Sequence, residues 1–237
     1  MPSVLHICTG MPMSGSRLAF EMAVAVLESA GIPQRRLDTV GRRKEANLLA
    51  ALDPKRLDPA LAEAAAGAAP IAIHSHASPG ETVPQEVRAG RISAQIVARD
   101  PRDVALSLLD AAQTVGGQLN PEREPLASLG EALDLVRNRM ENFAAWRQAV
   151  PDLLILNYEE LVADPDVSLE KIAAHLGVLV DTQPILARHG RRFATLGRGI
   201  PQRWREEMSV AEANGIHEEF AEYIERWCLP AGLPGRA

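Results

Sequence analysis

The chain alternates short apolar runs with longer segments in which apolar residues recur at helical spacing. Four runs have the length of buried strands: 4–8, 70–74, 94–98 and 153–158. The helical spacing predicts helices over 18–31, from 101 onward, over 128–150, 169–176 and 211–227, and two short ones over 47–53 and 58–66. Strands that alternate with helices predict an α/β protein, in which helices flank a central, mostly parallel sheet on both faces.

Local signals mark the start of two of these helices. Asp100 precedes Pro101, and aspartate is a preferred N-cap while proline is favoured at the first helical position. Ser128 and Glu131 have the spacing of a capping box at the start of the longest helix. Where periodicity is lost the sequence predicts loops, over 77–90, 115–125 and 188–205; the second is long enough for a flexible loop or a substrate lid.

The first apolar run ends in a loop rich in glycine, proline and serine, Gly10-Met11-Pro12-Met13-Ser14-Gly15-Ser16. Such a loop and the helix that follows it point several backbone N–H groups at one spot, which favours an anion such as phosphate. The Gly10-x4-Gly15 spacing resembles the phosphate loop of nucleotide-binding proteins, but Ser16 and Arg17 replace its Lys-Ser/Thr ending. Hydrolysis of ATP or GTP is therefore disfavoured, and an ordinary strand–turn–helix corner is the alternative interpretation.

Composition narrows the class of protein. A chain of 237 residues, 46% apolar but only 4% aromatic, suits one α/β domain over 1–237 with a core of Ala, Leu and Val. It has no apolar run that could span a bilayer and no evident signal peptide, so we expect a soluble, cytoplasmic protein without a membrane partner. The net charge of −6 argues against a nucleic-acid partner, and neither cysteine has metal-ligand spacing, so no metal is expected.

Four chemically distinctive features follow predicted strands. They are the 10–17 loop, His74 with His76, Arg99 with Asp100, and Tyr158. Because parallel α/β sheets bind ligands at the carboxyl ends of their strands, we expect all four to lie along one edge.

Arg99 is the strongest candidate for a phosphate ligand among them. It ends a strand, and Ser107 lies two turns into the helix that follows, so a guanidinium fork and a hydroxyl donor could meet one phosphate. The alternative is that Arg99 only pairs with Asp100 or Asp103.

These residues resemble those of a known family, the sulfotransferases that use 3′-phosphoadenosine-5′-phosphosulfate (PAPS). Residues 99–107, Arg-Asp-Pro-Arg-Asp-Val-Ala-Leu-Ser, closely resemble the family's 3′-phosphate-binding segment, and the 10–16 loop resembles its 5′-phosphosulfate loop. Residues 158–165 match the segment whose tyrosine lies by the adenine, and Arg198-Gly199-x4-Trp204 resembles the C-terminal loop that closes over the 3′-phosphate.

The resemblance implies a three-layer, P-loop-like sulfotransferase domain that needs no metal. Its donor would be PAPS and its product 3′,5′-adenosine bisphosphate (PAP), and His76 matches the base that takes the proton of a small-molecule acceptor. The implied nucleotide contacts are Met13, Ser14, Gly15, Ser16, Arg17 and Leu18 at the 5′ side, Arg99, Ser107, Arg198 and Gly199 at the 3′-phosphate, and Tyr158 at the adenine.

The chain also departs from the family. Met13 stands where the family has Lys or Arg beside the leaving oxygen, and His74 replaces another lysine. Either Arg17 supplies the missing charge, with protonated His74 assisting, or the charge is lost and the protein binds PAP or PAPS with little transfer. A P-loop kinase-like phosphotransferase is a further alternative. The acceptor, a hydroxyl or amine compound held by 77–92 and 115–127, is not identified by these residues, and neither is the oligomeric state.

Overall fold

A computed structural model describes residues 3–40, 47–67, 69–114, 126–196 and 199–228. Its centre is a sheet of five strands in the order β2-β3-β1-β4-β5, and every neighbouring pair is parallel. The strands are β1 (Leu5–Gly10), β2 (Leu48–Leu49), β3 (Ile71–Ser75), β4 (Ile92–Ala98) and β5 (Leu154–Asn157).

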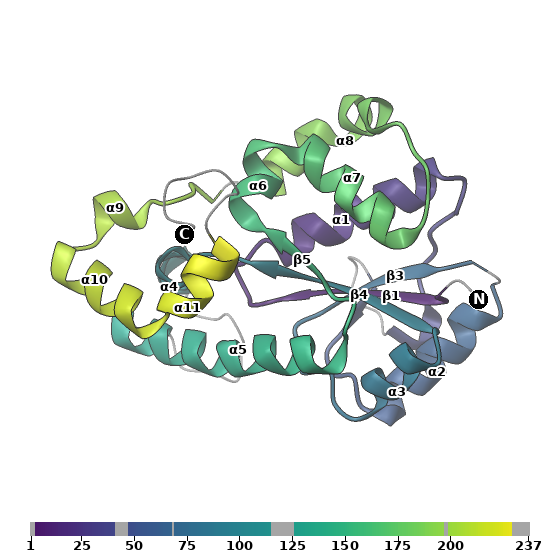
Figure 1. Ribbon diagram of the computed structural model, residues 1–237, viewed down its shortest axis with the longest axis horizontal. Coiled ribbons are helices and arrows are strands. Elements are labelled where there is room, and N and C mark those ends of the chain that lie inside the picture. The colour runs from purple at the N-terminus through teal and green to yellow at the C-terminus, as the bar shows by residue number, and fades with distance from the viewer. Residues whose placement is uncertain (1–2, 41–46, 68, 115–125, 197–198, 229–237) are drawn as a thin grey trace.

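Helices cover both faces of this sheet, which gives three layers (Figure 1). One face carries α1 (Ser16–Ser29), α6 (Tyr158–Ala163), α7 (Pro165–Leu176) and α8 (Thr182–Leu196). The other carries α2 (Pro54–Ala65), α3 (Thr82–Arg88) and α5 (Leu129–Ala149). The remaining helices are the 3₁₀ turn η1 (Asp38–Val40), α4 (Pro101–Thr114), α9 (Trp204–Glu207), α10 (Val210–Glu219), α11 (Ala221–Tyr223) and the π-helical turn η2 (Ile224–Cys228). The predicted fold class is confirmed.

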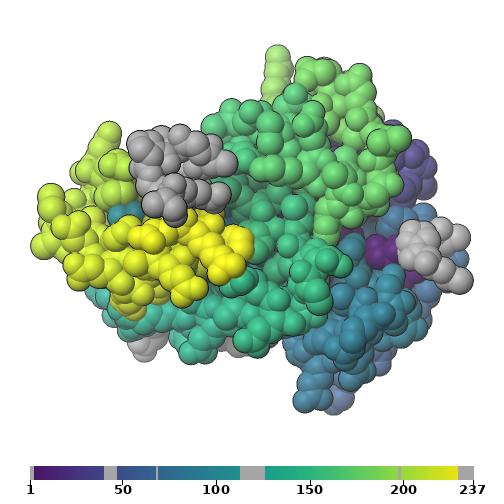
Figure 2. Space-filling model, viewed as in Figure 1, coloured from purple at the N-terminus to yellow at the C-terminus, as the bar shows by residue number. Residues whose placement is uncertain are grey.

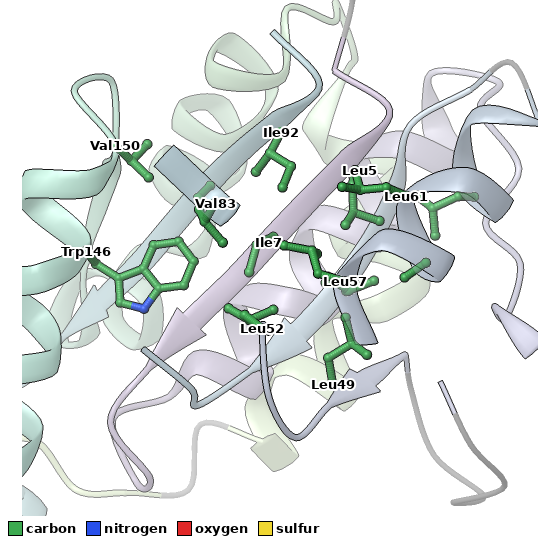
Figure 3. Packing of buried hydrophobic residues seen from close by; sticks show 14 of the residues in the cluster. Leu5, Ile7, Leu49, Leu52, Leu57, Leu61, Val83, Ile92, Trp146 and Val150 are labelled. Carbon is green, nitrogen blue, oxygen red and sulfur yellow. The ribbon is translucent and has the colours of Figure 1, made fainter. Parts of the chain in front are cut away.

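The alternation of side chains along β1 explains the two cores. Leu5 and Ile7 point to the side of α2, α3 and α5, where Trp146 completes the cluster (Figure 3). Cys8 points to the opposite side, against α1 and α7. All of β1 is buried because parallel sheets have helices on both faces.

A third apolar cluster joins α4, α5 and α10 beyond the end of the sheet. There Arg137 of α5 pairs with Glu219 of α10 at 2.6 Å, and the ring centroids of Phe143 and Tyr223 are 4.9 Å apart. Figure 2 shows α5 and the C-terminal helices lying side by side at this end of the molecule.

The predicted starts of the helices after 100 and 128 are confirmed. An Asp100 carboxylate oxygen accepts the backbone N–H of Arg102 at 2.9 Å, and Ser128 Oγ accepts that of Glu131 at 3.2 Å. The Glu131 carboxylate reaches back to the N–H of Ala127.

The prediction of a helix over 47–53 is wrong. Leu48 and Leu49 form the edge strand β2, and the Asn47 carbonyl accepts the backbone N–H of His74 at 2.7 Å. The Asn47 side chain also donates to Ala72 O at 3.1 Å, so a buried amide fixes this segment beside β3. The next helix begins at Pro54, earlier than predicted, because Asp53 caps it.

Other predicted boundaries also change. The 77–90 loop contains α3, whose Pro84 falls within the first helical turn, where proline is tolerated. Much of the 188–205 loop belongs to α8, which buries Ile185 and Phe193 against α1 despite Gly190. The helix predicted over 211–227 is interrupted at Phe220, the helix predicted over 169–176 begins at Pro165, and the strand predicted over 153–158 ends at Asn157. The loop predicted over 115–125 lies outside the described residues.

Among the described residues, no helix combines the length and the apolar character needed to cross a bilayer.

Candidate functional site

The carboxyl ends of β1, β3 and β4 and the start of α6 meet at a pocket of about 420 Å³. The pocket brings together most of the residues singled out from the sequence: Met13, Gly15, Ser16, Arg17, Leu18, His74, His76, Arg99, Ser107, Tyr158 and Gly199. Ser14 lies just behind this lining and is fully buried. Arg198 lies outside the described residues.

The loop between β1 and α1 presents backbone donors to the pocket. Gly15 is the N-cap of α1 with φ 92° and makes no side-chain cap, and the helix ladder starts with the bond from Ala19 N to Gly15 O. The N–H groups of Ser16, Arg17 and Leu18 therefore precede the ladder. Ser14 Oγ is buried and has no hydrogen-bond partner in the described part of the chain. Both features fit an anion in this loop.

Arg99 carries the second set of unused donors. Its side chain is 3% exposed, Nη1 donates to Met13 O at 2.6 Å, and the guanidinium lies 4.2 Å from the centroid of the Tyr158 ring. Nε and Nη2 have no hydrogen-bond partner among the described residues. A buried guanidinium with open donors is costly without an anion, so this geometry fits a phosphate better than a structural role alone.

The two aspartates that were alternative partners for Arg99 hydrogen-bond elsewhere. Asp100 pairs with Arg102 at 2.6 Å, and both side chains are buried. The carboxylate of Asp103 accepts the backbone N–H groups of Gln202 at 2.6 Å and Trp204 at 3.1 Å. Asp103 therefore fixes residues 202–204, just after Gly199.

Tyr158 links three separate segments of the chain. Its hydroxyl donates to Gly199 O at 3.0 Å, and its ring stacks on the Arg99 guanidinium. A Cβ at Gly15 would lie 2.5 Å from the Tyr158 ring, and a Cβ at Gly199 would lie 2.6 Å from the Tyr158 hydroxyl. Both glycines are therefore needed for space around this tyrosine.

His76 directly follows β3, and its hydrogen bond defines its tautomer. Nδ1 is 2.8 Å from Gly10 O, and because a carbonyl oxygen only accepts, Nδ1 carries the proton and Nε2 is left as the basic nitrogen. Burial lowers the pKa of His76, the bond to Gly10 opposes this, and the charge of Arg139 lowers the pKa further. The ring is therefore neutral near pH 7, as a general base must be.

His74 is also neutral. Burial lowers its pKa to about 3, with further contributions from His76 and Arg17. Its Nε2 is 3.1 Å from Ser16 Oγ, and its ring contacts that of His76 edge to face at 4.6 Å between centroids. This argues against a protonated His74 as the replacement cation.

Arg17 remains the candidate for that charge. It is exposed, it lies in the first turn of α1, and it lines the pocket. Its positive charge lowers the pKa of His74, a second residue of the pocket lining.

Some residues at the site were not predicted from the sequence. Leu48 of β2 and Leu196 of α8 line the pocket, and Leu48 fell in a segment predicted as helix. Arg139 and Asn142 of α5 donate to the carbonyl of His76 at 3.4 and 3.2 Å. Only the fold brings α5 to this strand end, and no local pattern indicates that contact.

Comparisons with known proteins agree with this geometry. Residues 94–182, which include Arg99, Ser107 and Tyr158, match the family model described as sulfotransferase family. No curated protein matches the chain in sequence.

Solved structures share the fold at low sequence identity. Mouse sulfotransferase SULT7A1 complexed with PAP superposes with a TM-score of 0.63 at 18% identity, covering 94% of this chain and 85% of that one. Retinol dehydratase in complex with retinol and PAP gives 0.57 at 15%, covering 97% and 83%. Retinol dehydratase with androsterone and PAP gives 0.58 at 15%, covering 98% and 84%.

Proposed function

We propose that this chain is a sulfotransferase that transfers the sulfuryl group of PAPS to a hydroxyl or amine of a small molecule; the match of residues 94–182 to the sulfotransferase family model and the shared fold support this. The observation that carries the proposal is the buried Arg99, which lines a pocket shared with the 13–18 loop and His76 and whose Nε and Nη2 have no hydrogen-bond partner among the described residues. We take residues 1–237 as one such domain, with no metal in the reaction.

The two ends of the nucleotide would occupy two groups of donors. Ser14 and the N–H groups of the first turn of α1 would hold the 5′-phosphosulfate, with Met13 and Leu18 as neighbouring contacts. Arg99 and Ser107 would hold the 3′-phosphate beside Gly199, and the family resemblance assigns Arg198 to the same phosphate. Tyr158 is largely buried between Gly15, Arg99 and Gly199, so it would offer the adenine no more than a small part of its surface.

The reaction needs a base and a positive charge. PAPS supplies the sulfuryl group, whose bond to the 5′-phosphate oxygen breaks as a bond to the acceptor forms. His76 Nε2 would take the acceptor's proton, because Nδ1 is already bound to Gly10 O. Arg17 would stabilise the charge on the leaving oxygen in place of a loop lysine.

The proposed acceptor is a small molecule. Solved sulfotransferase-fold neighbours carry retinol or androsterone, which supports a small molecule rather than a polymer. The apolar side chains Leu48, Leu196 and Met13 in the lining are compatible with such a ligand.

A second candidate function is nucleotide binding with little or no transfer. Met13 favours it, because a thioether supplies no charge at the position next to the leaving oxygen. Turnover separates the two functions, whereas binding alone does not.

Nucleotide binding is tested by calorimetric titration with PAP and, separately, ATP. PAP should bind and ATP should not compete with it at equal concentration. Arg99→Ala should weaken PAP binding by roughly 2–4 kcal/mol, because the phosphate loses charge-assisted bonds to a buried partner. The exposed Arg88→Ala is the control, and equal affinities for the two variants would show that the phosphate lies elsewhere.

Transfer is tested with ³⁵S-labelled PAPS and a panel of phenols, alcohols and amines. His76→Ala should keep PAP affinity and lose roughly 10²–10⁴-fold in turnover, the range that general bases supply. His217→Ala on α10 is the matched histidine control. Binding without any turnover of wild-type protein would favour the second candidate function, and full turnover by His76→Ala would exclude His76 as the base.

A further inference from the structure

One face of α5 is directed at the backbone just after β3. Arg139, Asn142 and Trp146 lie three and four residues apart in succession, so their side chains project from the same side of the helix. Asn142 Nδ2 donates to His76 O at 3.2 Å, Arg139 Nη1 donates to the same oxygen at 3.4 Å, and Trp146 Nε1 donates to Ala77 O at 3.0 Å.

These donors meet a part of the chain that has left the sheet. β3 ends at Ser75, so the carbonyls of His76 and Ala77 have no ladder partner, and Ala77 N turns back onto Ser75 Oγ at 3.1 Å. The other side of His76 is held by the last residue of β1, since Nδ1 binds Gly10 O at 2.8 Å. The residue is therefore fixed at its backbone by α5 and at its ring by β1.

The charged and titratable groups around the ring come from two elements. Arg139 approaches from α5, and His74 approaches from β3 with its ring centroid 4.6 Å away. His74 is itself neutral, because burial and Arg17 of α1 lower its pKa to about 3. Arg139 is thus the charged group that opposes protonation of His76, while the Gly10 carbonyl favours it.

We propose that Arg139 and Asn142 are positioning residues for the His76 imidazole, holding it at the pocket edge with Nε2 unprotonated and directed at the acceptor. The proposal rests on the proposed function, in which His76 is the base. It assigns to α5 a role in catalysis beyond covering the sheet.

The effect of the Arg139 charge on the protonation of His76 is tested on the free protein by NMR titration of the ¹⁵N-labelled imidazoles. This measurement needs neither PAPS nor an acceptor. Arg139→Gln should shift the midpoint of His76 to higher pH. Arg137→Gln, also on α5 but 45% exposed and paired with Glu219, should leave it unchanged. Identical His76 midpoints in wild type and Arg139→Gln would overturn the proposal.

The same variants separate positioning from substrate binding in turnover assays. In Arg139→Gln, the acidic limb of the pH profile of kcat/KM should move to higher pH with PAP affinity unchanged. A rise in acceptor KM without that movement would mean that Arg139 contacts the acceptor, and the proposal would fail.

Asn142 is tested by Asn142→Ala against the exposed Asn138→Ala one turn away. The first should lower kcat several-fold with unchanged PAP affinity and thermal stability close to that of the control. Unchanged kcat in Asn142→Ala would remove Asn142 from the proposal. If His76→Ala retains full turnover, the proposed base fails first, whatever the NMR titration shows.

Discussion

Met13 contributes to the candidate site through its backbone carbonyl. Met13 has φ 66°, in the left-handed region that non-glycine residues rarely adopt, and its carbonyl accepts Nη1 of Arg99 at 2.6 Å. The loop thus orients the arginine assigned to the other phosphate, even though the side chain at this position has no charge. Because the contact uses the Met13 carbonyl, it does not depend on which side chain stands at position 13.

The proposed role of Arg17 as the replacement cation predicts both a loss of rate and its rescue. Arg17→Ala should lower kcat by about 10²-fold, the size seen when one donor to a developing oxyanion is removed. Met13→Lys introduced into Arg17→Ala should restore much of that loss, because the ammonium would return to the family's position. Single-turnover transfer from ³⁵S-labelled PAPS measures both effects.

Arg191→Ala, an exposed arginine of α8, is the control for the loss of a nearby positive charge. If Arg17→Ala matches this control while Met13→Lys alone raises the rate many-fold, Arg17 does not replace the lysine.

Helix α4 serves two parts of the site at once. Ser107 on its first half lines the pocket, while Arg102 stacks on the Trp204 ring at 3.5 Å and Asp103 accepts the N–H groups of Gln202 and Trp204. The element that follows Arg99 therefore also fixes the C-terminal segment next to Gly199.

Asp103→Asn should loosen that segment. An amide oxygen replaces one acceptor and an NH₂ replaces the other, so one backbone N–H of residues 202–204 loses its partner. PAP binding should weaken by about 1–2 kcal/mol, with most of the change in the dissociation rate measured by stopped flow. Asp110 lies on the same helix as Asp103, and Asp110→Asn, which breaks only an exposed ion pair with the Arg203 side chain, should cost far less. Equal dissociation rates for the two variants would contradict the role of Asp103.

The elements that the sequence predicted correctly carry their own local signals. Asp100 and Ser128 cap the helices that follow them, and the runs of β1, β3, β4 and β5 are apolar enough to be read as buried strands. β2 and α8 are defined by distant partners instead. Leu48 and Leu49 become a strand only because β3 lies beside them, and α8 forms around Gly190 because Ile185 and Phe193 pack on α1.

At the scale of the whole molecule, buried histidines link stability to pH. His6 is fully buried, with Nε2 donating to Gln95 Oε1 at 3.1 Å, and burial lowers its pKa to about 3. Burial also lowers the pKa of His74, His76 and His175. The unfolded chain takes up these protons from about pH 6.5 downward, while the folded chain resists them. Each such histidine therefore lowers stability as pH falls from 6.5 towards its folded pKa, by up to about 1.4 kcal/mol per pH unit.

Glu159 acts in the opposite direction. Burial raises its pKa to about 7, so the folded chain gains a proton before the unfolded chain does and stability rises as pH falls from 7 towards 4.5, by up to about 1.4 kcal/mol per pH unit. The four histidines outweigh Glu159 and Asp103, the second carboxyl whose pKa burial raises. The free energy of unfolding, measured by urea at pH 7.5, 6.0 and 5.0, should therefore decrease across this series. His6→Gln should flatten the slope, and His217→Gln should not. A slope that is the same in wild type and His6→Gln would contradict the assignment.

The residues of the candidate site, like the helices and strands, fall into those that local sequence signals predict and those that depend on distant partners. The 10–17 loop, Arg99, Ser107 and Tyr158 could be found from the sequence because each lies at a strand end or a helix start, where parallel topology gathers them. Asp103 with residues 202–204, and Arg139 and Asn142 with His76, could not be found, because those pairs are separated by more than sixty residues and join only after the layers pack.

The close fit of Tyr158 against two glycines constrains how this protein can diverge. A methyl group at position 15 or 199 would overlap the aromatic side chain at 158, and a smaller residue at 158 would leave a hole between the loop and the arginine. Substitutions at these three positions should therefore be accepted only in combination. A homologue with alanine at one of the glycine positions should carry a smaller side chain in place of the tyrosine.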